Sequence, residues 1–344
     1  EGKCRGFLIG EEHKGIQCMF MMMNEARIGV GIQGMATAAS AYLEALKYAR
    51  ERIQGTDIAE FKNVDAPRIP IAKHPDVRRM LWTQKAYVEG CRALLYQTAL
   101  WADTAEHSPD GDARQRAMGL LELMTPICKA YSSDMGFKVC ELAVQTFGGY
   151  GYCQEYPVEQ YLRDNKIASI YEGANGIQAM DLLGRKVSMK GGMYLMTFLN
   201  ELNIFTEAQG GHPVFGEYVK QLDEAKNKLA EVTMHFGSLG MSGDVQYPVY
   251  HAVPYLYFFG DVVLGWLHLR MAISAHEAFV QFCAGKGLTG DDEKKKLCME
   301  NDEAKFYDGK MRGAKFFMTQ LLPRYKGFEA AIMSNDRSGL ETEP

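Results

Sequence analysis

Apolar residues recur every three or four positions along most of this chain, the spacing typical of amphipathic helices. Residues 16–53 contain no proline and are predicted to form one long helix. The apolar stripe along its later half consists of Ile28, Ile32, Met35, Ala39, Tyr42 and Leu46. Near its start, the cluster Met19–Met23 is apolar on every side of a helix, which predicts burial, with core filling favoured over a ligand surface.

The same spacing continues downstream with few interruptions. Further helices are predicted over 74–106, 113–147, 157–170, 177–186, 213–239, 249–285 and 292–322. Pro126 is expected to kink or restart the third helix. Residues 54–72 are predicted to be a loop, 148–157 neither helix nor strand, and 188–192 a linker. The sole predicted strand covers Arg5 to Gly10.

These elements predict an all-α fold made of antiparallel helices with short connections. We expect a helix bundle over residues 16–188 and a second helical domain over 189–344. A length of 344 residues agrees with about two such domains. Glu rather than Met at position 1 suggests that the chain is a fragment or a processed product.

Composition excludes several classes of function. The net charge of -5 argues against a nucleic-acid partner. The eight cysteines contain no C-x-x-C pair and are expected to be buried and reduced, as in a cytoplasmic protein. The longest charge-free apolar stretch, Val245 to Gly260, contains two prolines and is too short to span a membrane. The eight histidines form no metal-binding motif, so no metal site is expected.

Two glycine-containing segments flank one short predicted helix and are the best candidates for chemistry. Gly148, Gly149 and Gly151 allow a ligand to approach the backbone closely, although no preceding strand supports a dinucleotide-binding loop. Glu172 lies in the second segment, between Tyr171 and Gly173. A carboxylate in an apolar cleft has a raised pKa and is a usable base for a carbon-bound proton. From the residues alone, a carboxylate near the start of the 177–186 helix is the favoured alternative by roughly two to one.

Several ordered motifs resemble the C-terminal helical domain of acyl-CoA dehydrogenases. They are Gly10-Glu-Glu-His-Lys-Gly15, Asn24-Glu-Ala-Arg-Ile-Gly29, Gln145-Thr-Phe-Gly-Gly-Tyr-Gly-Tyr152, Glu155-Tyr-Pro-Val-Glu159, Arg163-Asp164 and Ile170-Tyr-Glu-Gly-Ala-Asn-Gly-Ile-Gln178. Together they cover about 180 residues and are far more specific than any one of them. The remainder, with His251-Ala-Val-Pro-Tyr-Leu256 and Phe306-Tyr-Asp-Gly-Lys310, resembles the extra helical domain of large bacterial members such as methylthiopropionyl-CoA dehydrogenases.

The resemblance implies that FAD takes a hydride from the β-carbon of an acyl-CoA while Glu172 removes the α-proton. It implies further that Asn24, Arg27 and Gly173 lie at the substrate. Contacts with FAD are implied for Arg52, Gln145, Gly148, Gly149, Ala174 and Asn175, with Arg52 often serving the partner subunit. Arg27 and Arg52 have the alternative of being solvated helix charges. Ala174, Gly176 and Pro75 depart from the residues common in relatives, and two contacts with FAD are therefore missing.

The expected function is dehydrogenation of an acyl-CoA, with an electron-transfer flavoprotein as acceptor and a homodimer or homotetramer as the assembly. An acyl-CoA oxidase and a non-catalytic flavin-binding scaffold are the alternatives. The resemblance also implies that residues 1–15 are the end of a β-domain and that the chain is a fragment of a longer enzyme. The isolated chain is therefore expected to show little or no turnover.

Overall fold

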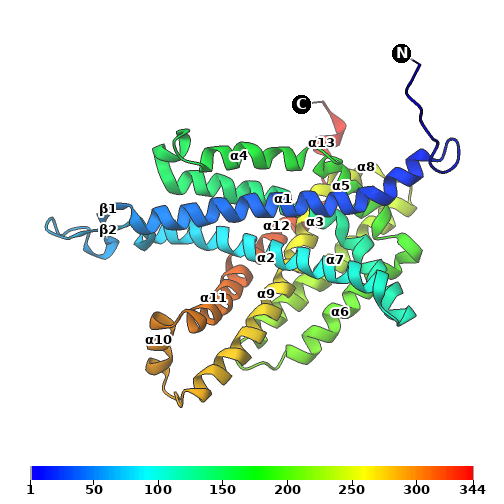
Figure 1. The fold of residues 1–344 in the computed structure, drawn as a ribbon. Coiled ribbons are helices and arrows are strands. Elements are labelled where there is room, and N and C mark those ends of the chain that lie inside the picture. The colour runs from blue at the N-terminus through cyan, green and yellow to red at the C-terminus, as the bar shows by residue number, and fades with distance from the viewer. Residues whose placement is uncertain (1, 344) are drawn as a thin grey trace.

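The computed structural model describes residues 2–343, except for the side chains of residues 17, 20 and 21 (Figure 1). The first half of the chain is built on three long helices, α1 (Gly15–Glu51), α2 (Pro75–His107) and α3 (Gly111–Phe147), with α4 (Val158–Lys166) alongside them. The boundaries agree with the apolar spacing within a few residues. Pro126 lies inside α3, which continues through it unbroken instead of restarting.

Glycines allow α1 and α3 to approach each other closely. A Cβ on Gly34 would lie 2.9 Å from the Cα of Ser133, and one on Gly136 would lie 2.7 Å from the carbonyl oxygen of Gly34. Asn165, at the end of α4, donates a hydrogen bond to the same carbonyl of Gly34. These contacts fix the register of α1, α3 and α4, and thereby the positions of the loops that join them.

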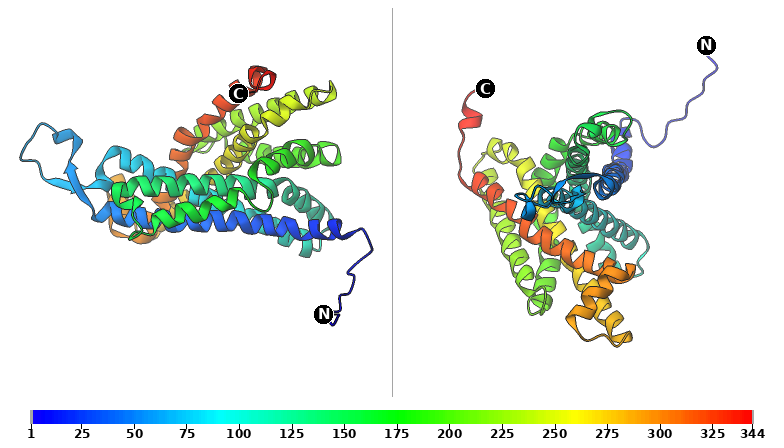
Figure 2. Two further views of the ribbon diagram at one scale, coloured as in Figure 1. Left: turned by 90° about the horizontal axis from the view of Figure 1, so that it is seen from above. Right: turned by 90° about the vertical axis from the view of Figure 1, so that its left-hand side faces the viewer.

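Two predictions about β-structure are wrong. Residues 2–9 form no strand and extend away from the helices into solvent, with Phe7 89% exposed (Figure 2). A strand needs a hydrogen-bonding partner, and none of the described residues pairs with this segment. The observed sheet is instead an antiparallel pair, β1 (Ile53–Thr56) and β2 (Arg68–Pro70), inside the predicted loop. Short 3₁₀ helices cover Ile58–Glu60 and Ile71–Lys73.

The segment after α3 is more helical than its glycines predict. A 3₁₀ helix covers Gly148–Tyr152, and another, Ile167–Ser169, follows α4. Helix α5 (Asn175–Asp181) continues as a π-helix over Leu182–Lys186. The predicted linker is a tight turn, with a 3₁₀ segment over Met189–Gly192 in which Lys190 and Gly191 have left-handed backbone angles.

The second half of the chain is entirely helical. It contains α6 (Met193–Gln209), α7 (Gly216–Met241), α8 (Gln246–Tyr250), α9 (Ala252–Gly285), α10 (Asp291–Glu300), α11 (Asp302–Phe316), a π-helix (Phe317–Leu321), a 3₁₀ helix (Leu322–Arg324), α12 (Tyr325–Met333) and α13 (Ser338–Glu341). Helix α6 is absent from the sequence predictions. Helices α12 and α13 also lie beyond the last predicted range, which ends at residue 322. The others overlap the predicted helical regions, which the structure divides more finely.

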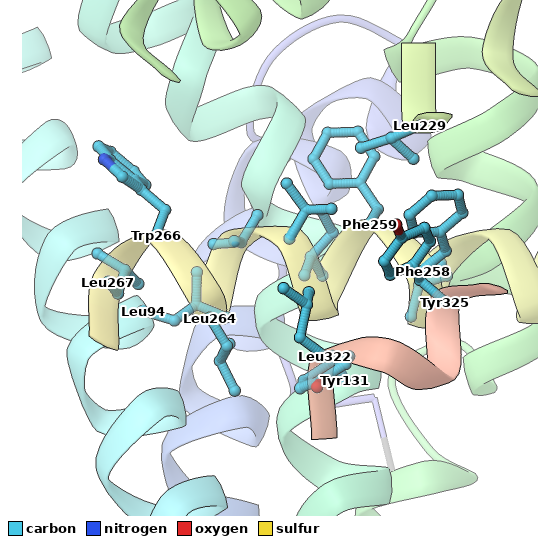
Figure 3. Close-up of a cluster of buried hydrophobic side chains, with 14 of the residues drawn as sticks. Leu94, Tyr131, Leu229, Phe258, Phe259, Leu264, Trp266, Leu267, Leu322 and Tyr325 are labelled. Atoms are coloured by element: carbon cyan, nitrogen blue, oxygen red, sulfur yellow. The ribbon is translucent and has the colours of Figure 1, made fainter. Parts of the chain in front are cut away.

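Helix α9 is the centre of the core. Its buried face carries Phe258, Phe259, Leu264 and Trp266, which lie among side chains of α2, α3, α7 and the 322–325 segment (Figure 3). It is long and apolar enough to cross a membrane, but 83% of its most apolar window is buried inside the protein. The large core cluster includes residues from Met35 to Ile332, so both halves of the chain share it.

A buried ionic network joins α3 and α9 to the chain near α12. The Arg324 guanidinium donates two hydrogen bonds to the Asp261 carboxylate, at 2.5 and 2.6 Å, and a third to the hydroxyl oxygen of Tyr131. Tyr131 in turn donates to Asp261, and both of these side chains are 0% exposed. A Cβ on Gly260 would lie 2.0 Å from the ring of Tyr131, so glycine is required beside this network.

Two predictions about burial are partly wrong. Met19 and Met22 are 42% and 64% exposed, because the start of α1 extends beyond the helices that cover its later half, while residues 20 and 21 lie outside the described side chains. Of the eight cysteines, four are buried, one is half-buried, and Cys4, Cys18 and Cys153 are exposed. None of the eight forms a disulfide within the described part of the chain.

Candidate functional site

The Tyr171–Gly173 turn has a strained backbone that presents Glu172. Glu172 has φ of 56° and Gly173 has φ of 83°, two consecutive residues in the left-handed region. A residue other than glycine adopts this region at a cost of order 1–3 kcal/mol and keeps it only where the surroundings impose it. Such strain is concentrated at functional sites.

Gln178 and Tyr171 impose the conformation of this turn. The fully buried Gln178 amide donates to the carbonyl oxygens of Glu172 and Gly173, at 3.5 and 3.4 Å. A Cβ on Gly173 would lie 2.6 Å from the Gln178 Nε2 atom, so glycine is required for space as well as for its φ. The Tyr171 hydroxyl donates to Gln33 on α1 and ties the turn to that helix.

Asn175 directs its side chain inward, toward α3. Its Oδ1 atom accepts a hydrogen bond from the Lys129 ammonium at 2.8 Å. Its Nδ2 atom donates to the hydroxyl of Ser133 at 2.9 Å and to the carbonyl of Ala130 at 3.2 Å. Ala174 is exposed and has no polar side-chain atom. Residues 174 and 175 therefore offer mainly backbone groups toward the outside of the turn.

Lys129 is a functional candidate that the sequence reasoning missed. Its side chain is 0% exposed, and burial lowers the pKa of its amine to about 8. The nearby charges of Asp134 and Glu172 oppose this shift, and that of Arg27 adds to it. The available signal was a lysine inside the apolar run Ile127-Cys-Lys-Ala-Tyr131, since lysine is rarely found fully buried.

The two predicted substrate residues on α1 lie in the same polar region. Arg27 is 7% exposed, so it is no solvated helix charge, and its guanidinium lies 3.5 Å from the Asp181 carboxylate of α5. Its Nε atom is buried without a hydrogen-bond partner among the described residues. Asn24 donates to Glu122 at 3.2 Å, and the fully buried ammonium of Lys186 donates to the other oxygen of Glu122. The region beneath the turn is therefore rich in buried cations.

The other predicted cofactor residues form a separate group at the β1 end of α1. The guanidinium of Arg52 lies over the ring of Tyr150, 5.4 Å from its centroid. Gln145, Gly148 and Gly149 are exposed nearby at the end of α3, and Gly148 ends that helix with φ of 63°. A Cβ on Gly148 or Gly149 would meet nothing within 4 Å, so a ligand can approach the backbone there.

The structure does not bring these two groups together. Tyr171 contacts α1 at Gln33, and Arg52 follows nineteen residues later at the end of the same helix. At 1.5 Å per residue, this separation is about 28 Å. One group surrounds Glu172 and contains Asn24, Arg27, Gly173, Ala174 and Asn175. The other contains Arg52, Gln145, Gly148 and Gly149.

The surroundings of the Tyr171–Gly173 turn are polar and charged. The charges of Asp134, Arg27 and Glu172 all act on the Lys129 amine. No group of three or more metal-binding side chains occurs within residues 2–343, as far as the structure describes them. The arrangement can hold a carboxylate at a fixed position, which a base requires.

Comparisons with known proteins agree over nearly the whole chain. The family described as "Acyl-CoA dehydrogenase, C-terminal domain" matches residues 13–187, and "Acetyl-CoA dehydrogenase C-terminal like" matches residues 198–343. The broad-specificity linear acyl-CoA dehydrogenase FadE5 of Mycobacterium tuberculosis is 35% identical over 98% of this chain and 54% of its own length. The 3-methylmercaptopropionyl-CoA dehydrogenase of Ruegeria pomeroyi is 38% identical over 92% of this chain and 50% of its own length.

A solved structure supports the same fold. The acyl-CoA dehydrogenase from Bacillus anthracis, described as complexed with FAD, superposes with a TM-score of 0.68 at 18% identity, over 97% of this chain and 52% of that one. The chain thus spans about half the length of the curated relatives it matches. The motifs, the fold and both family matches place this chain in the acyl-CoA dehydrogenase family.

Proposed function

We propose that this chain provides the catalytic base for the FAD-dependent α,β-dehydrogenation of an acyl-CoA thioester. The observation that supports it best is the left-handed backbone of Glu172, which Gln178 and Gly173 hold in place. A base fixed in this way needs no reorganisation before it removes a proton. Membership of the acyl-CoA dehydrogenase family supplies the reaction class.

In the proposed reaction, Glu172 removes the proton from the α-carbon of the thioester. A backbone N–H of the turn polarises the thioester carbonyl and stabilises the charge that develops on its oxygen. FAD, when bound, supplies the redox chemistry by accepting the hydride from the β-carbon. The product is the enoyl-CoA. Arg27, which pairs with Asp181, would act by holding α5 and the turn in position.

The residues at the β1 end of α1 fit the phosphate groups of FAD. Arg52 supplies a cation, and Gly148 and Gly149 leave their backbone open to a close approach. Gln145 lies exposed beside them. At the other group, Ala174 and Asn175 would contact the cofactor through their backbone, because the Asn175 side chain is directed to α3.

The separation of about 28 Å between the groups favours an assembly in which each serves a different FAD molecule. We therefore propose a homodimer or homotetramer, in which Arg52 serves the cofactor of a partner subunit. Light scattering of the FAD-loaded protein measures the assembly. An Arg52→Ala variant should lose FAD affinity in a titration while its Glu172 group stays intact.

The test of the function uses the FAD-loaded full-length protein. Anaerobic stopped-flow mixing with acyl-CoA should bleach the flavin, and Glu172→Gln should slow this bleaching by about 10²–10⁴-fold. Unchanged bleaching in Glu172→Gln would refute the assignment of the base. We propose an electron-transfer flavoprotein as acceptor, and a high yield of hydrogen peroxide in air would show an oxidase instead.

A further inference from the structure

The buried ammonium of Lys129 has an unusual partner. Its Nζ atom donates to the neutral amide oxygen of Asn175 at 2.8 Å, and it forms no ion pair with a carboxylate of the described residues. A fully buried cation is costly unless it is paired with an opposite charge. The position of Lys129 therefore calls for an explanation other than stability.

Asn175 links Lys129 to the turn that carries Glu172. It is the first residue of α5 and follows Glu172 by three positions. All three of its hydrogen bonds, from Lys129 and to Ser133 and Ala130, join it to one stretch of α3. Helix α5 thus begins at a point fixed on α3, and residues 172–174 must span the distance from there to Tyr171.

This fixed point explains how the strained turn persists. Gln178, also on α5, donates to the carbonyl oxygens of Glu172 and Gly173, so its hold on the turn depends on where α5 begins. Tyr171 is held from the other side by Gln33 of α1. If α5 moved away from α3, the left-handed conformation at Glu172 would relax toward a more common one.

We propose that Lys129 is a positioning residue for Glu172, which acts by holding Asn175 and the start of α5 against α3. The proposal rests on the function proposed above, in which Glu172 is the base. Three charged groups face Lys129: Asp134 from its own helix, Arg27 from α1, and Glu172 from the turn. The ammonium donates to Asn175 and interacts electrostatically with these groups.

Hydrogen exchange tests this inference without an activity assay. The backbone amides of Tyr171 and Gln178 flank the turn and donate to the carbonyls of Ile167 and Ala174, each at 3.1 Å. In a Lys129→Met variant, which keeps most of the side-chain length without the charge, we expect their protection to fall at least about tenfold. Lys138→Met, an exposed lysine of the same helix, is the matched control and should leave both amides unchanged.

Turnover in the FAD-loaded full-length protein gives the second readout. Lys129→Met should lower kcat at least about tenfold with little change in KM, because only the placement of the base is altered. Lys129→Arg should recover part of the loss, since it restores a donor to Asn175. Ser133→Ala, which removes one hydrogen bond of Asn175, should give a smaller effect in the same direction if Lys129→Met does not fold.

The outcomes separate this inference from the proposed function. If the wild-type protein shows no acyl-CoA-dependent flavin reduction, the proposed function fails, while the exchange measurement still tests the hold on the turn. If the wild type is active and Lys129→Met keeps both its amide protection and its kcat, the positioning role of Lys129 is refuted. Loss of protection throughout α3 and α7 would indicate general destabilisation and would also overturn it.

Discussion

Two polar clusters lie on opposite sides of α3 and differ in how completely they are paired. Lys129 and Tyr131 are two positions apart, which on a helix is a rotation of about 200°. Tyr131 faces Asp261 and Arg324, where a carboxylate and a guanidinium form two hydrogen bonds and a tyrosine hydroxyl completes the set. Lys129 faces Asn175, a neutral amide, in a region where the Arg27 Nε and Gln178 Oε1 atoms lack partners.

The difference separates a cluster whose polar atoms are paired from one that leaves polar atoms without partners. The Asp261 cluster joins α3, α9 and the chain before α12, and its polar atoms are paired within the protein. The Lys129 cluster leaves buried polar atoms unpaired, which costs about 1–3 kcal/mol for each. Proteins keep such unfavourable features mainly where a site must bind a ligand or react with one. The strained turn at Glu172 lies beside this cluster.

The largest expected effect comes from breaking the Asp261 cluster. Asp261→Ala leaves the Arg324 guanidinium buried without its carboxylate and should lower the free energy of unfolding by about 3–5 kcal/mol. Urea denaturation followed by circular dichroism measures the change. The double variant Asp261→Leu/Arg324→Met removes both charges and should recover most of the loss. No recovery would mean that the cluster contributes more than charge pairing.

A smaller effect is expected at the turn. Gly173→Ala places a Cβ 2.6 Å from Gln178 and requires a positive φ of alanine, and it should lower the free energy of unfolding by about 1–3 kcal/mol. Gly176→Ala, three residues later in α5, meets nothing within 4 Å and should stabilise the protein by about 0.5–1 kcal/mol. Thermal unfolding measures the melting temperature of each variant. A shift of both melting temperatures in the same direction would contradict the strain argument.

The pH dependence of the free energy of unfolding should report the burial of the Lys129 amine in its cluster. Burial lowers the pKa of Lys129 to about 8 from its ordinary value of 10.5, so between these values the unfolded chain binds more protons than the folded one. Relative to Lys129→Met, the wild type should therefore gain stability as the pH rises from about 8 to 10.5. Unfolding measured at several pH values in this window gives the difference, and a difference that is constant or falls would be inconsistent with a buried charged amine.

The smallest effect is expected at the surface of α3. Lys138 and Glu141 form an ion pair in which both side chains are about half exposed, so Lys138→Met should change the free energy of unfolding by less than about 0.5 kcal/mol. The same denaturation experiment measures it. If Lys138→Met instead lowered the free energy of unfolding as much as Asp261→Ala does, burial would not be what distinguishes strong from weak polar interactions around α3.

Helix positions could be predicted from the sequence because apolar spacing directly reflects the buried face. The ranges 16–53, 74–106 and 113–147 agree closely with α1, α2 and α3. Helix α6 was missed because its residues follow a glycine pair and carry no clear polar face. The strand predicted for residues 5–10 is absent and the β1–β2 pair was missed, since a strand depends on a partner that local sequence does not identify.

The candidate site was predictable only where a motif marked it. The Tyr171–Gly173 segment was identified from its glycine and its family resemblance, and the structure adds the left-handed backbone of Glu172. Lys129 belongs to no motif, and Gln178 ends the Ile170–Gln178 motif without an assigned role. Their roles depend on contacts across 46 and five to six residues of sequence. The inward direction of Asn175 likewise depends on the packing of α5 against α3.

The π-helical turn after α5 has a consequence for insertions and deletions. Residues 182–186 contain one residue more than an α-helical turn needs, and this widened turn ends at Lys186, whose ammonium donates to Glu122. Deleting Gly184 should let the segment close as an α-helical turn, with the later residues near their present orientation, because the widened turn accommodates one extra residue. This turn should therefore tolerate the loss of one residue better than the interior of α3, where a deletion would rotate every later residue by about 100° around the helix axis.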